Sequence, residues 1–537
     1  MFDFDPSIYP YPSRRNCIFA EKGMVATGQP LAAQAGLEML KKGGNAIDAA
    51  IATAACLTVV EPPANGIGGD AFCIGWVNGQ LIGLNASGPS PQGLTIDKLK
   101  EQGLTEMPDI GWGPVTVPGV PAAWAELSRK FGKLSLIEVL GPAIAYAQEG
   151  YPVSPGVASN WSKRLRYYDR HAKGEQFKFW YDTFAPNGRT PRPGEVWRSP
   201  DHARTLQSIG ESYADSFYLG EIAEKIDAFS RSYGGYIRKE DLSQYSVDWV
   251  SPISVDYRGY RIWELPPNGQ GIIALQALNI LKGYDFVHRE LIDTYHKQIE
   301  AIKLAFTDGM AYIADPDHMQ TTVEQLLSEE YAEKRRQTIQ SEAVVPKAGE
   351  IIPPGGTVYL ATADLDGNMV SYIQSNYDGF GSGLVVPGTG IALQNRGHCF
   401  SFDPEHVNCL EPGKRSYHTI IPGFLTKDNV PVGPFGVMGG FIQPQAHVQV
   451  LMNAIDFGMN PQAALDAPRW KWLEKRSVQV ECHFPEHLAN QLVHRGHDIS
   501  MVLDHSGFGR GQIIWRNSDG VLCAGTEGRT DGSIAAW

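Results

Sequence analysis

The stretch Pro353–Gly383, PPGGTVYLATADLDGNMVSYIQSNYDGFGSG, places one threonine directly after a flexible Pro-Pro-Gly-Gly approach. The runs that follow, Thr357–Ala363 and Met369–Ser375, are rich in β-branched and aromatic residues, which favours two strands. Leu365-Asp366-Gly367 lies between them and has the form of a three-residue hairpin loop with Gly near its end. The stretch therefore predicts a β-hairpin with Thr357 at the head of its first strand.

The register of this hairpin follows if Asp364 pairs with Asn368, because that pairing sets Thr357 opposite Ser375. Directly opposed side chains of neighbouring strands come close enough for a hydroxyl–hydroxyl hydrogen bond. From these residues alone two interpretations are open. The pair is either the polar rim of an ordinary hairpin or part of a catalytic site.

A threonine is a useful nucleophile when it is the N-terminal residue of a chain. Its own α-amine, with an ordinary pKa of about 7.7–8.0, can then take the hydroxyl proton near neutral pH. Gly355-Gly356 favours a cut before Thr357, because glycine tolerates the strained backbone needed for the Thr357 hydroxyl to attack the preceding carbonyl. The boundary that the sequence indicates is therefore Gly356/Thr357.

The composition of the chain excludes several classes of function. Its 537 residues, 43% of them hydrophobic, suffice for a large core in about three domains or in one interlocked α/β unit. The net charge of −13 argues against nucleic acid or an anionic membrane as a partner, because phosphate binding needs a basic face. The sequence has no run of 18 apolar residues, so we expect no transmembrane helix.

The termini and the cysteines favour a cytoplasmic protein. The first residues lack the basic-then-apolar pattern of a secretion signal, although an exported form whose signal is absent from this sequence is an alternative. The seven cysteines form no CxxC pair, and several lie in apolar runs, which predicts reduced and buried thiols. The histidines between 398 and 418 fit no zinc-binding spacing. We expect no metal and no cofactor.

Apolar spacing predicts two helices over residues 31–60, separated by Gly43-Gly44, with Asn45 at the start of the second. Residues 72–86 predict a pair of strands around the turn Asn78-Gly79, and Ile253–Leu265 resembles a further strand.

The region from about 120 to 330 is predicted to be mostly helical. The aromatic and basic stretch Trp161–Trp180 interrupts it and is expected to cover an edge of the core. Charged residues and then Pro and Gly predict an exposed linker over Ser328–Gly356. Beyond Thr357 we expect strands, apart from one helix near Gln445–Phe457.

Short motifs along nearly the whole chain resemble, in order, those of γ-glutamyltranspeptidases, which are self-processing N-terminal-nucleophile hydrolases. No single motif is strong, but the ordered set is specific. The set includes KGGNAIDAA (42–50), NGIGG (65–69), VPGVP (117–121), EDLSQY (240–245), FGSG (380–383), KR (414–415) and MGG (438–440). The resemblance implies an α+β fold, the four-layer αββα sandwich. It also implies that a large fragment, 1–356, and a small fragment, 357–537, stay associated as one catalytic unit.

The resemblance further implies roles for single residues. Thr357 is the nucleophile for both processing and turnover, and Ser375 stands where the family has a threonine that orients it. Gly439 and Gly440 stand where backbone N–H groups form an oxyanion hole. Glycine suits that role because the backbone must approach a tetrahedral intermediate closely. Without the resemblance, these two glycines predict only a tight turn between strands.

The segments that bind substrate depart from the family pattern. Ser87 stands where the family has an arginine for the α-carboxylate of a glutamyl group. Arg396 and Cys399 replace the amide and the acid that hold its α-ammonium. The other replaced positions are His418 and Thr419, which stand for paired serines, and Tyr377, which stands for an asparagine.

These replacements bear on the substrate. A cation beside an ammonium, with no carboxylate between them, is repulsive, so Arg396 would weaken the binding of glutamate. A guanidinium instead suits an acyl group that carries a carboxylate but no α-amine, and His418 could add a second donor. Glutaryl, oxamate-like and other short dicarboxylic monoamides are then plausible substrates, as in the cephalosporin acylase-like and oxamate hydrolase-like branches. Alternatively, Arg396 and His418 are structural and another residue holds a γ-glutamyl amine.

We therefore expect a self-processing amidohydrolase or acyltransferase acting on a small-molecule amide of a γ-glutamyl or similar short carboxy-acyl group, with a glutaryl acylase or oxamate-type amidohydrolase that lacks γ-glutamyl activity as the alternative. Thr357 attacks the carbonyl, an acyl-enzyme forms, and water or an acceptor amine releases the acyl group. Two processed units could also associate as a homodimer. The competing hypothesis is a non-enzymatic binding protein that descends from the family and never cleaves itself.

Overall fold

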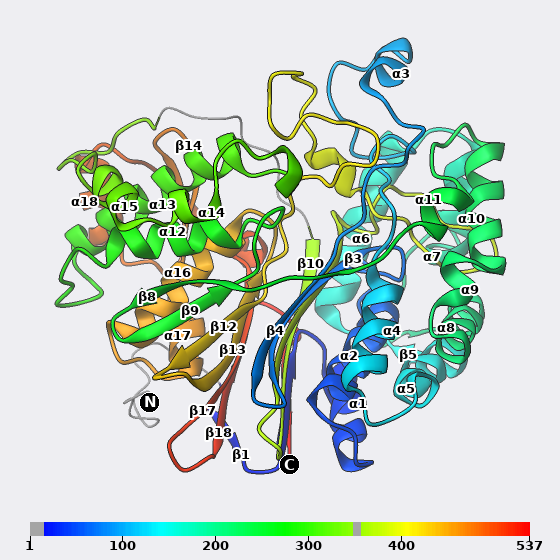
Figure 1. The fold of residues 1–537 in the computed structure, drawn as a ribbon, viewed down its shortest axis with the longest axis horizontal. Coiled ribbons are helices and arrows are strands. Elements are labelled where there is room, and N and C mark those ends of the chain that lie inside the picture. The colour runs from blue at the N-terminus through cyan, green and yellow to red at the C-terminus, as the bar shows by residue number, and fades with distance from the viewer. Residues whose placement is uncertain (1–14, 347–355) are drawn as a thin grey trace.

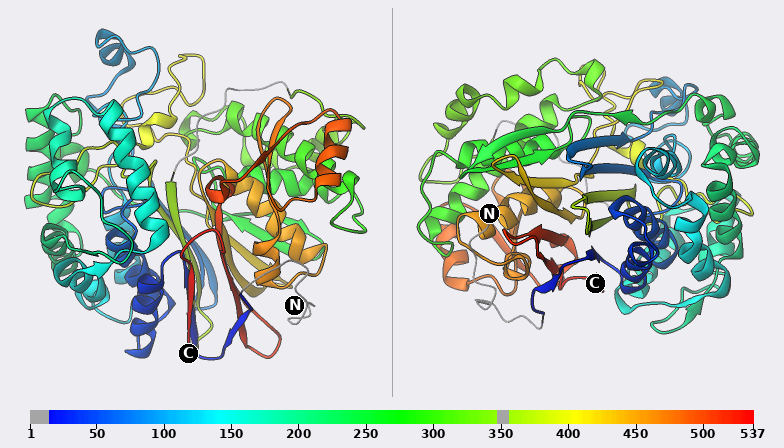
Figure 2. Two further views of the ribbon diagram at one scale, coloured as in Figure 1. Left: turned by 180° about the vertical axis from the view of Figure 1, so that it is seen from behind. Right: turned by 60° about the horizontal axis from the view of Figure 1, so that its bottom comes forward.

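The computed structural model describes residues 15–346 and 356–537. Two seven-stranded sheets lie face to face, and helices cover the outer face of each, as Figures 1 and 2 show. This is the four-layer αββα sandwich that the resemblance implied. Each sheet combines strands that are far apart in the sequence, so the N-terminal and C-terminal parts of the chain form both sheets together.

One sheet, here called sheet A, has the strand order β1 (Ile18–Ala20), β18 (Leu522–Thr526), β17 (Arg510–Arg516), β13 (Val430–Met438), β12 (Gly423–Lys427), β9 (Tyr260–Glu264) and β8 (Ile253–Tyr257). The other, sheet B, has the order β19 (Ser533–Ala536), β2 (Gly23–Thr27), β10 (Gly356–Asp364), β11 (Met369–Tyr377), β3 (Asp70–Val77), β4 (Gln80–Ala86) and β7 (Asp248–Trp249).

Helices from the first half of the chain lie on the side of sheet B (Figure 1). They are α1 (Pro30–Lys41), α2 (Ala46–Val60), α4 (Val120–Phe131), α5 (Leu136–Glu149), α6 (Pro155–His171), α7 (Lys178–Phe184), α8 (Pro200–Ser212), α9 (Asp215–Tyr218), α10 (Glu221–Ser232) and α11 (Lys239–Ser243). The side of sheet A carries α12 (Gly271–Leu281), α13 (Ile292–Tyr312), α14 (Val323–Leu326), α15 (Glu329–Arg336), α16 (Ile442–Ile455), α17 (Pro461–Asp466) and α18 (Glu486–His494).

Several smaller elements lie outside the two large sheets and the helices that cover them. They are the helix α3 (Ile96–Glu101), the strand pair β5 (Tyr151–Pro152) and β6 (Val196–Trp197), the sheet β14 (Trp470–Glu474), β15 (Ser477–Glu481) and β16 (Asp498–Val502), and the 3₁₀ turns η1 (Glu175–Phe177), η2 (Pro316–His318), η3 (Arg396–Cys399) and η4 (His505–Phe508).

The hairpin β10–β11 has the register read from the sequence. Val358 pairs with Gln374, and the Asp364 N–H donates to the Asn368 carbonyl over 3.0 Å. Alternation then divides the side chains, because successive residues of a strand face opposite sides. Tyr359 packs between the two sheets, whereas Leu360 joins the core under the helices of sheet B. The register shifts by one residue before Val358, at the position of Thr357.

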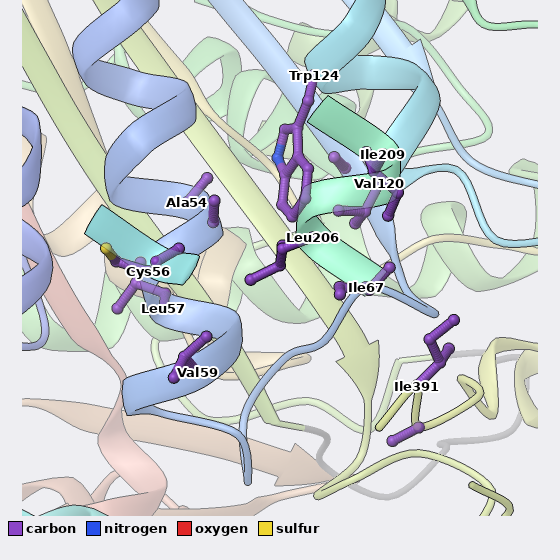
Figure 3. Packing of buried hydrophobic residues seen from close by; sticks show 14 of the residues in the cluster. Ala54, Cys56, Leu57, Val59, Ile67, Val120, Trp124, Leu206, Ile209 and Ile391 are labelled. Carbon is purple, nitrogen blue, oxygen red and sulfur yellow. The ribbon is translucent and has the colours of Figure 1, made fainter. Parts of the chain in front are cut away.

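Helix α2 is buried on every side, which suits a helix that is apolar all round. Its Leu57 and Val59 lie in one cluster with Trp124 of α4 and Leu206 of α8, as the close view in Figure 3 shows. Asn45 caps the helix as the sequence indicated, with its side-chain oxygen accepting from two backbone N–H groups of the first turn. This packing supports β10 and β11 from behind.

Other local predictions are also confirmed. Helix α1 ends before Gly43, whose φ of +91° suits glycine. The β3–β4 turn has positive φ at both Asn78 and Gly79. Six of the seven cysteines are buried, and Cys482 is half-buried. Across the described parts of the chain, every helix is too short or too polar to cross a bilayer.

Three expectations were wrong. The stretch Trp161–Trp180 does not interrupt the helical region but forms most of α6, η1 and the start of α7. Its two tryptophans lie inside the core, against Phe380, rather than at an edge. The expected linker begins with the helix α15, and its residues 347–355 lie outside the described ranges. The C-terminal part contains α17 and α18 besides the predicted helix.

Candidate functional site

Thr357 lies at the point where the two sheets face each other. It is the second residue of β10 in sheet B, at the register shift before Val358, and β10 packs against β13 of sheet A. Thr357 and Gly439, which follows β13, both line a cavity of about 410 Å³. The remaining walls come mainly from α6 and from the loop around η4. The side chain of Thr357 is almost completely buried at the inner end of this arrangement.

The Thr357 hydroxyl is held by its partner across the hairpin. Its Oγ1 donates to the Ser375 Oγ over 3.2 Å, which confirms the hydrogen bond expected from the register. The Ser375 Oγ also accepts the Tyr377 N–H over 2.8 Å. The Ser375 oxygen is therefore fixed from the backbone, and it fixes the direction of the Thr357 hydroxyl in turn.

Gly439 and Gly440 connect β13 to α16 and have φ values of +136° and +69°. A Cβ at Gly439 would lie 2.8 Å from the Ile442 Cγ2, so a side chain there is excluded by both space and backbone conformation. The Gly440 carbonyl accepts the side-chain amide of Gln270 over 3.0 Å. This turn precedes the N-terminus of α16, where backbone N–H groups favour negative charge.

Arg396 is a buried arginine whose charge is incompletely paired. It lies in η3 with only 1% of its surface exposed. Its Nη1 donates to the Thr419 Oγ1 over 2.8 Å, and its guanidinium carbon lies 4.6 Å from the centre of the Tyr377 ring. Its Nε and Nη2 groups have no hydrogen-bond partner among the residues that the structure describes. An unmatched buried cation of this kind is costly unless an anion binds to it.

The sequence reasoning missed Asp70, the first residue of β3. The β3–β11 register pairs Asp70 with Ser375, whose hydroxyl oxygen accepts from Thr357, so the three residues lie on three neighbouring strands. Burial raises the pKa of Asp70 to about 7, and the Arg396 charge opposes that rise. The expectation that no carboxylate lies near Arg396 is therefore wrong. Only the preceding Gly68-Gly69 turn could have suggested this position from the sequence.

The hydrogen bonds of Asp70 leave it little capacity for a ligand. Its oxygens accept the Gly88 N–H over 3.1 Å, the Gln394 side-chain amide over 2.8 Å and the His418 Nε2 over 3.1 Å. The His418 Nδ1 accepts the Ile420 N–H over 3.3 Å, which assigns the ring proton to Nε2. Burial and then the Arg396 charge hold the pKa of His418 well below its usual value. His418 is a neutral partner of Asp70, and neither ring nitrogen is open as a second donor.

Ser87 is likewise engaged by neighbouring groups. Its hydroxyl donates to the Asn85 Oδ1 over 2.7 Å, and its carbonyl accepts the Arg415 Nε over 3.0 Å. Arg415 also forms an ion pair with Asp248. The structure thus brings an arginine to the backbone of Ser87, but its charge is already paired.

Two more pairs of charged groups line the Thr357 cavity, and sequence reasoning missed both. Glu61 follows α2 and lies 3.5 Å from Arg510, and burial raises its pKa to about 7. Arg164 of α6 pairs with Asp378 over 2.9 Å, and its guanidinium lies over the Tyr167 ring. The cavity wall therefore carries charged groups of both signs.

A family model described as gamma-glutamyltranspeptidase matches residues 32–537 of the chain. The chain belongs to the γ-glutamyltranspeptidase family. A solved structure, the cephalosporin acylase from Bacillus halodurans, is 62% identical with a TM-score of 0.96, and the comparison covers 100% of this chain and 99% of that one.

Two further members of the family are similar over almost their whole lengths. The glutathione hydrolase-like YwrD proenzyme of Bacillus subtilis is 36% identical, with 96% of this chain and 98% of that protein covered. The oxamate amidohydrolase proenzyme of Klebsiella pneumoniae is 33% identical, also over 96% and 98%. The chain is thus an amidohydrolase or acyltransferase of the γ-glutamyltranspeptidase family, with acylases and an oxamate amidohydrolase among its relatives.

Proposed function

We propose that the chain cuts itself between Gly356 and Thr357 and that the new N-terminal threonine hydrolyses amides of short dicarboxylic acids. The observation that carries this proposal is the Thr357 hydroxyl, hydrogen-bonded to Ser375 over 3.2 Å, in a residue that lines the same cavity as Gly439. A nucleophile, a group that orients it and a turn of glycines before a helix are the parts that acyl transfer needs.

The chemistry follows from those parts. The α-amine of Thr357 takes the proton from its own Oγ1, which attacks the amide carbonyl and forms a tetrahedral oxyanion. The N–H groups of Gly439 and Gly440 stabilise the negative oxygen. The protonated α-amine then gives its proton to the leaving amine as the C–N bond breaks, which leaves an ester on Thr357. Water or an acceptor amine, deprotonated by the same α-amine, releases the acyl group.

The arrangement of strands supports a cut that leaves the fragments associated. Sheet B would contain β10 and β11 of the small fragment between β2 and β3 of the large one. Sheet A would also mix strands from both fragments. Separation would break edge-to-edge hydrogen bonds in both sheets and expose the core between them. The Bacillus subtilis and Klebsiella pneumoniae relatives are both named proenzymes, which favours such processing here.

The preference for a carboxylated acyl group rests on Arg396. A planar guanidinium with two unmatched N–H groups suits the fork of a carboxylate. An α-ammonium at the same place would meet the like charge of Arg396, which the Asp70 carboxyl, whose pKa burial raises to about 7, offsets only in part near neutral pH. A glutaryl group presents the carboxylate without the ammonium. The name of the 62% identical relative, a cephalosporin acylase, favours the same acylase branch.

A comparison of two anilides tests this proposal. Glutaryl and γ-glutamyl p-nitroanilides have the same reacting amide and differ by one α-ammonium group. We expect a higher kcat/KM for the glutaryl compound with the processed protein. Faster release from γ-glutamyl anilide would contradict the role of Arg396, and release from neither would contradict the acyl class. Thr357→Ala serves as the control for background hydrolysis.

A further inference from the structure

A cluster of one thiol and two imidazoles lies outside the machinery described above. Cys482 and His483 follow β15 of the small sheet, and His505 begins η4 after β16. The Cys482 Sγ and one nitrogen of each histidine lie within 4.8 Å of one another. The Cys482 Sγ is 3.6 Å from the His505 Nε2, and the two histidine rings stack with their centres 5.6 Å apart.

The Glu481 carboxylate fixes the orientation of the His505 ring. Its Nδ1 lies 3.2 Å from the Glu481 Oε1. Glu481 also accepts the Arg529 Nε over 2.6 Å and the Arg469 N–H over 2.7 Å, as an ionised carboxylate does. The Nδ1 of His505 is therefore the protonated nitrogen, and its Nε2 directs a lone pair towards Cys482. A carboxylate that accepts the distal N–H of an imidazole is the usual support of a metal-ligating histidine.

The distances fit a tetrahedral ion. Zn²⁺ with Zn–S of about 2.3 Å and Zn–N of about 2.0–2.1 Å holds sulfur and nitrogen about 3.6 Å apart. The separation between the Cys482 Sγ and the His505 Nε2 already has this value. His483 is exposed, and Cys482 and His505 are half-buried, so an ion can reach the cluster from solvent. We propose that Cys482, His483 and His505 form a binding site for Zn²⁺, with water as the fourth ligand.

A second cluster of potential metal ligands consists of His296, Glu300 and His497. It differs from the Cys482 cluster in its access to solvent, its charge and its hydrogen bonds. It is completely buried, and the Lys303 ammonium lies 2.6 Å from the Glu300 Oε1, where it takes the place of a cation. The His296 Nδ1 and the His497 Nε2 are already hydrogen-bonded to each other over 2.9 Å. Charge and access therefore favour the Cys482 cluster.

The proposed ion-binding site lies next to the cavity that contains Thr357. Ser506 and Gly507, which follow His505 in η4, line the cavity that contains Thr357. A bound ion would tie η4 to the end of β15 and so fix one wall of that cavity. The binding test below does not depend on catalysis, so its outcome is separate from that of the proposed function.

The test uses the purified, chelator-treated full protein and two ions. Titration with Co²⁺ should produce a thiolate-to-cobalt charge-transfer absorption, and Zn²⁺ should remove it. Equilibrium dialysis should then give one Zn²⁺ per chain. Cys482→Ser and His505→Gln should lose the absorption and weaken Zn²⁺ binding by more than about 100-fold, beyond the loss expected from an outer-shell change. His483→Gln changes an exposed side chain and should weaken binding as well.

Matched variants separate this site from other thiols and imidazoles. Cys409→Ser and His487→Gln should bind both ions as the wild type does. Glu481→Gln keeps all three ligands and should weaken binding by about 10–100-fold. Thermal unfolding curves would verify that each variant is folded. Wild-type binding by both Cys482→Ser and His483→Gln, or the absence of Zn²⁺ binding by the wild type, would overturn the proposal.

Discussion

Replacement of Arg396 gives a prediction whose size can be derived from the structure. Within the described part of the chain, the Nε and Nη2 groups of the guanidinium have no hydrogen-bond partner, and only 1% of the residue's surface is exposed. A hydrogen bond to a charged group contributes about 1.5–3 kcal/mol, so two such bonds to an acyl carboxylate contribute about 3–6 kcal/mol. Since about 1.4 kcal/mol corresponds to a factor of ten, Arg396→Gln should lower kcat/KM for a glutaryl anilide by about 10²–10⁴-fold.

The assay compares two acyl groups on each variant. Pentanoyl p-nitroanilide replaces the glutaryl carboxylate by a methyl group, so it cannot use the guanidinium. Arg396→Gln should therefore lose most of the preference for glutaryl over pentanoyl that the wild type shows. Arg164→Gln is the matched control, because that cavity arginine already pairs with Asp378 and should affect both substrates alike.

The result that would refute this reasoning is a preserved glutaryl preference in Arg396→Gln. An equal fall for both anilides would also refute it, since that result would give Arg396 a structural role only. Thermal unfolding of the variant, measured beside the wild type, shows whether the site is still folded when the preference is lost.

Three other substitutions test separate parts of the site. Ser375→Ala removes the acceptor that orients the Thr357 hydroxyl, a hydrogen bond that contributes about 0.5–1.5 kcal/mol, so kcat should fall roughly 2- to 13-fold while Ser375→Thr keeps most activity; unchanged turnover in Ser375→Ala would contradict this. Gly439→Ala places a Cβ 2.8 Å from a neighbouring methyl group and disturbs the turn whose N–H groups are proposed to bind the oxyanion. Initial-rate measurements should therefore show kcat reduced by about 10²–10³-fold, with KM less affected. Glu61→Gln tests a buried carboxyl whose pKa burial raises to about 7 from an ordinary value of 4.5. Between these pH values the folded wild type holds a proton that the unfolded chain has lost, so its stability falls as pH rises through the window. The Tm of Glu61→Gln relative to wild type should therefore increase from pH 5 to pH 8, and a constant difference would argue against the raised pKa.

Local sequence patterns were sufficient for the hairpin and for the caps of the first helices. The register of β10–β11 depends on a short loop and on alternating side chains, which lie within 21 consecutive residues, 357–377. The hydrogen bond between Thr357 and Ser375 follows from that register. Asn45 was likewise readable as a cap because its bonds reach only two and three residues ahead.

The rest of the site depends on contacts between distant segments. Asp70 reaches Ser375 only because β3 pairs with β11, and no local pattern encodes that pairing. His418 is 348 residues from Asp70 in the sequence, so the hydrogen bond that removes it as a free donor also has no local pattern. Trp161 was misjudged for a similar reason. Its neighbours in sequence are basic, but Phe380 and Trp197 enclose its ring in the folded core.

The central claim is that Thr357 carries both the hydroxyl and the free amine of the reaction. N-terminal sequencing of the purified protein, separated under denaturing conditions, tests it most directly. The account predicts two fragments, of which the shorter begins Thr357-Val358-Tyr359, and a single uncut, inactive chain for Thr357→Ala. An active protein that remains one chain, or a shorter fragment that begins at another residue, would contradict it.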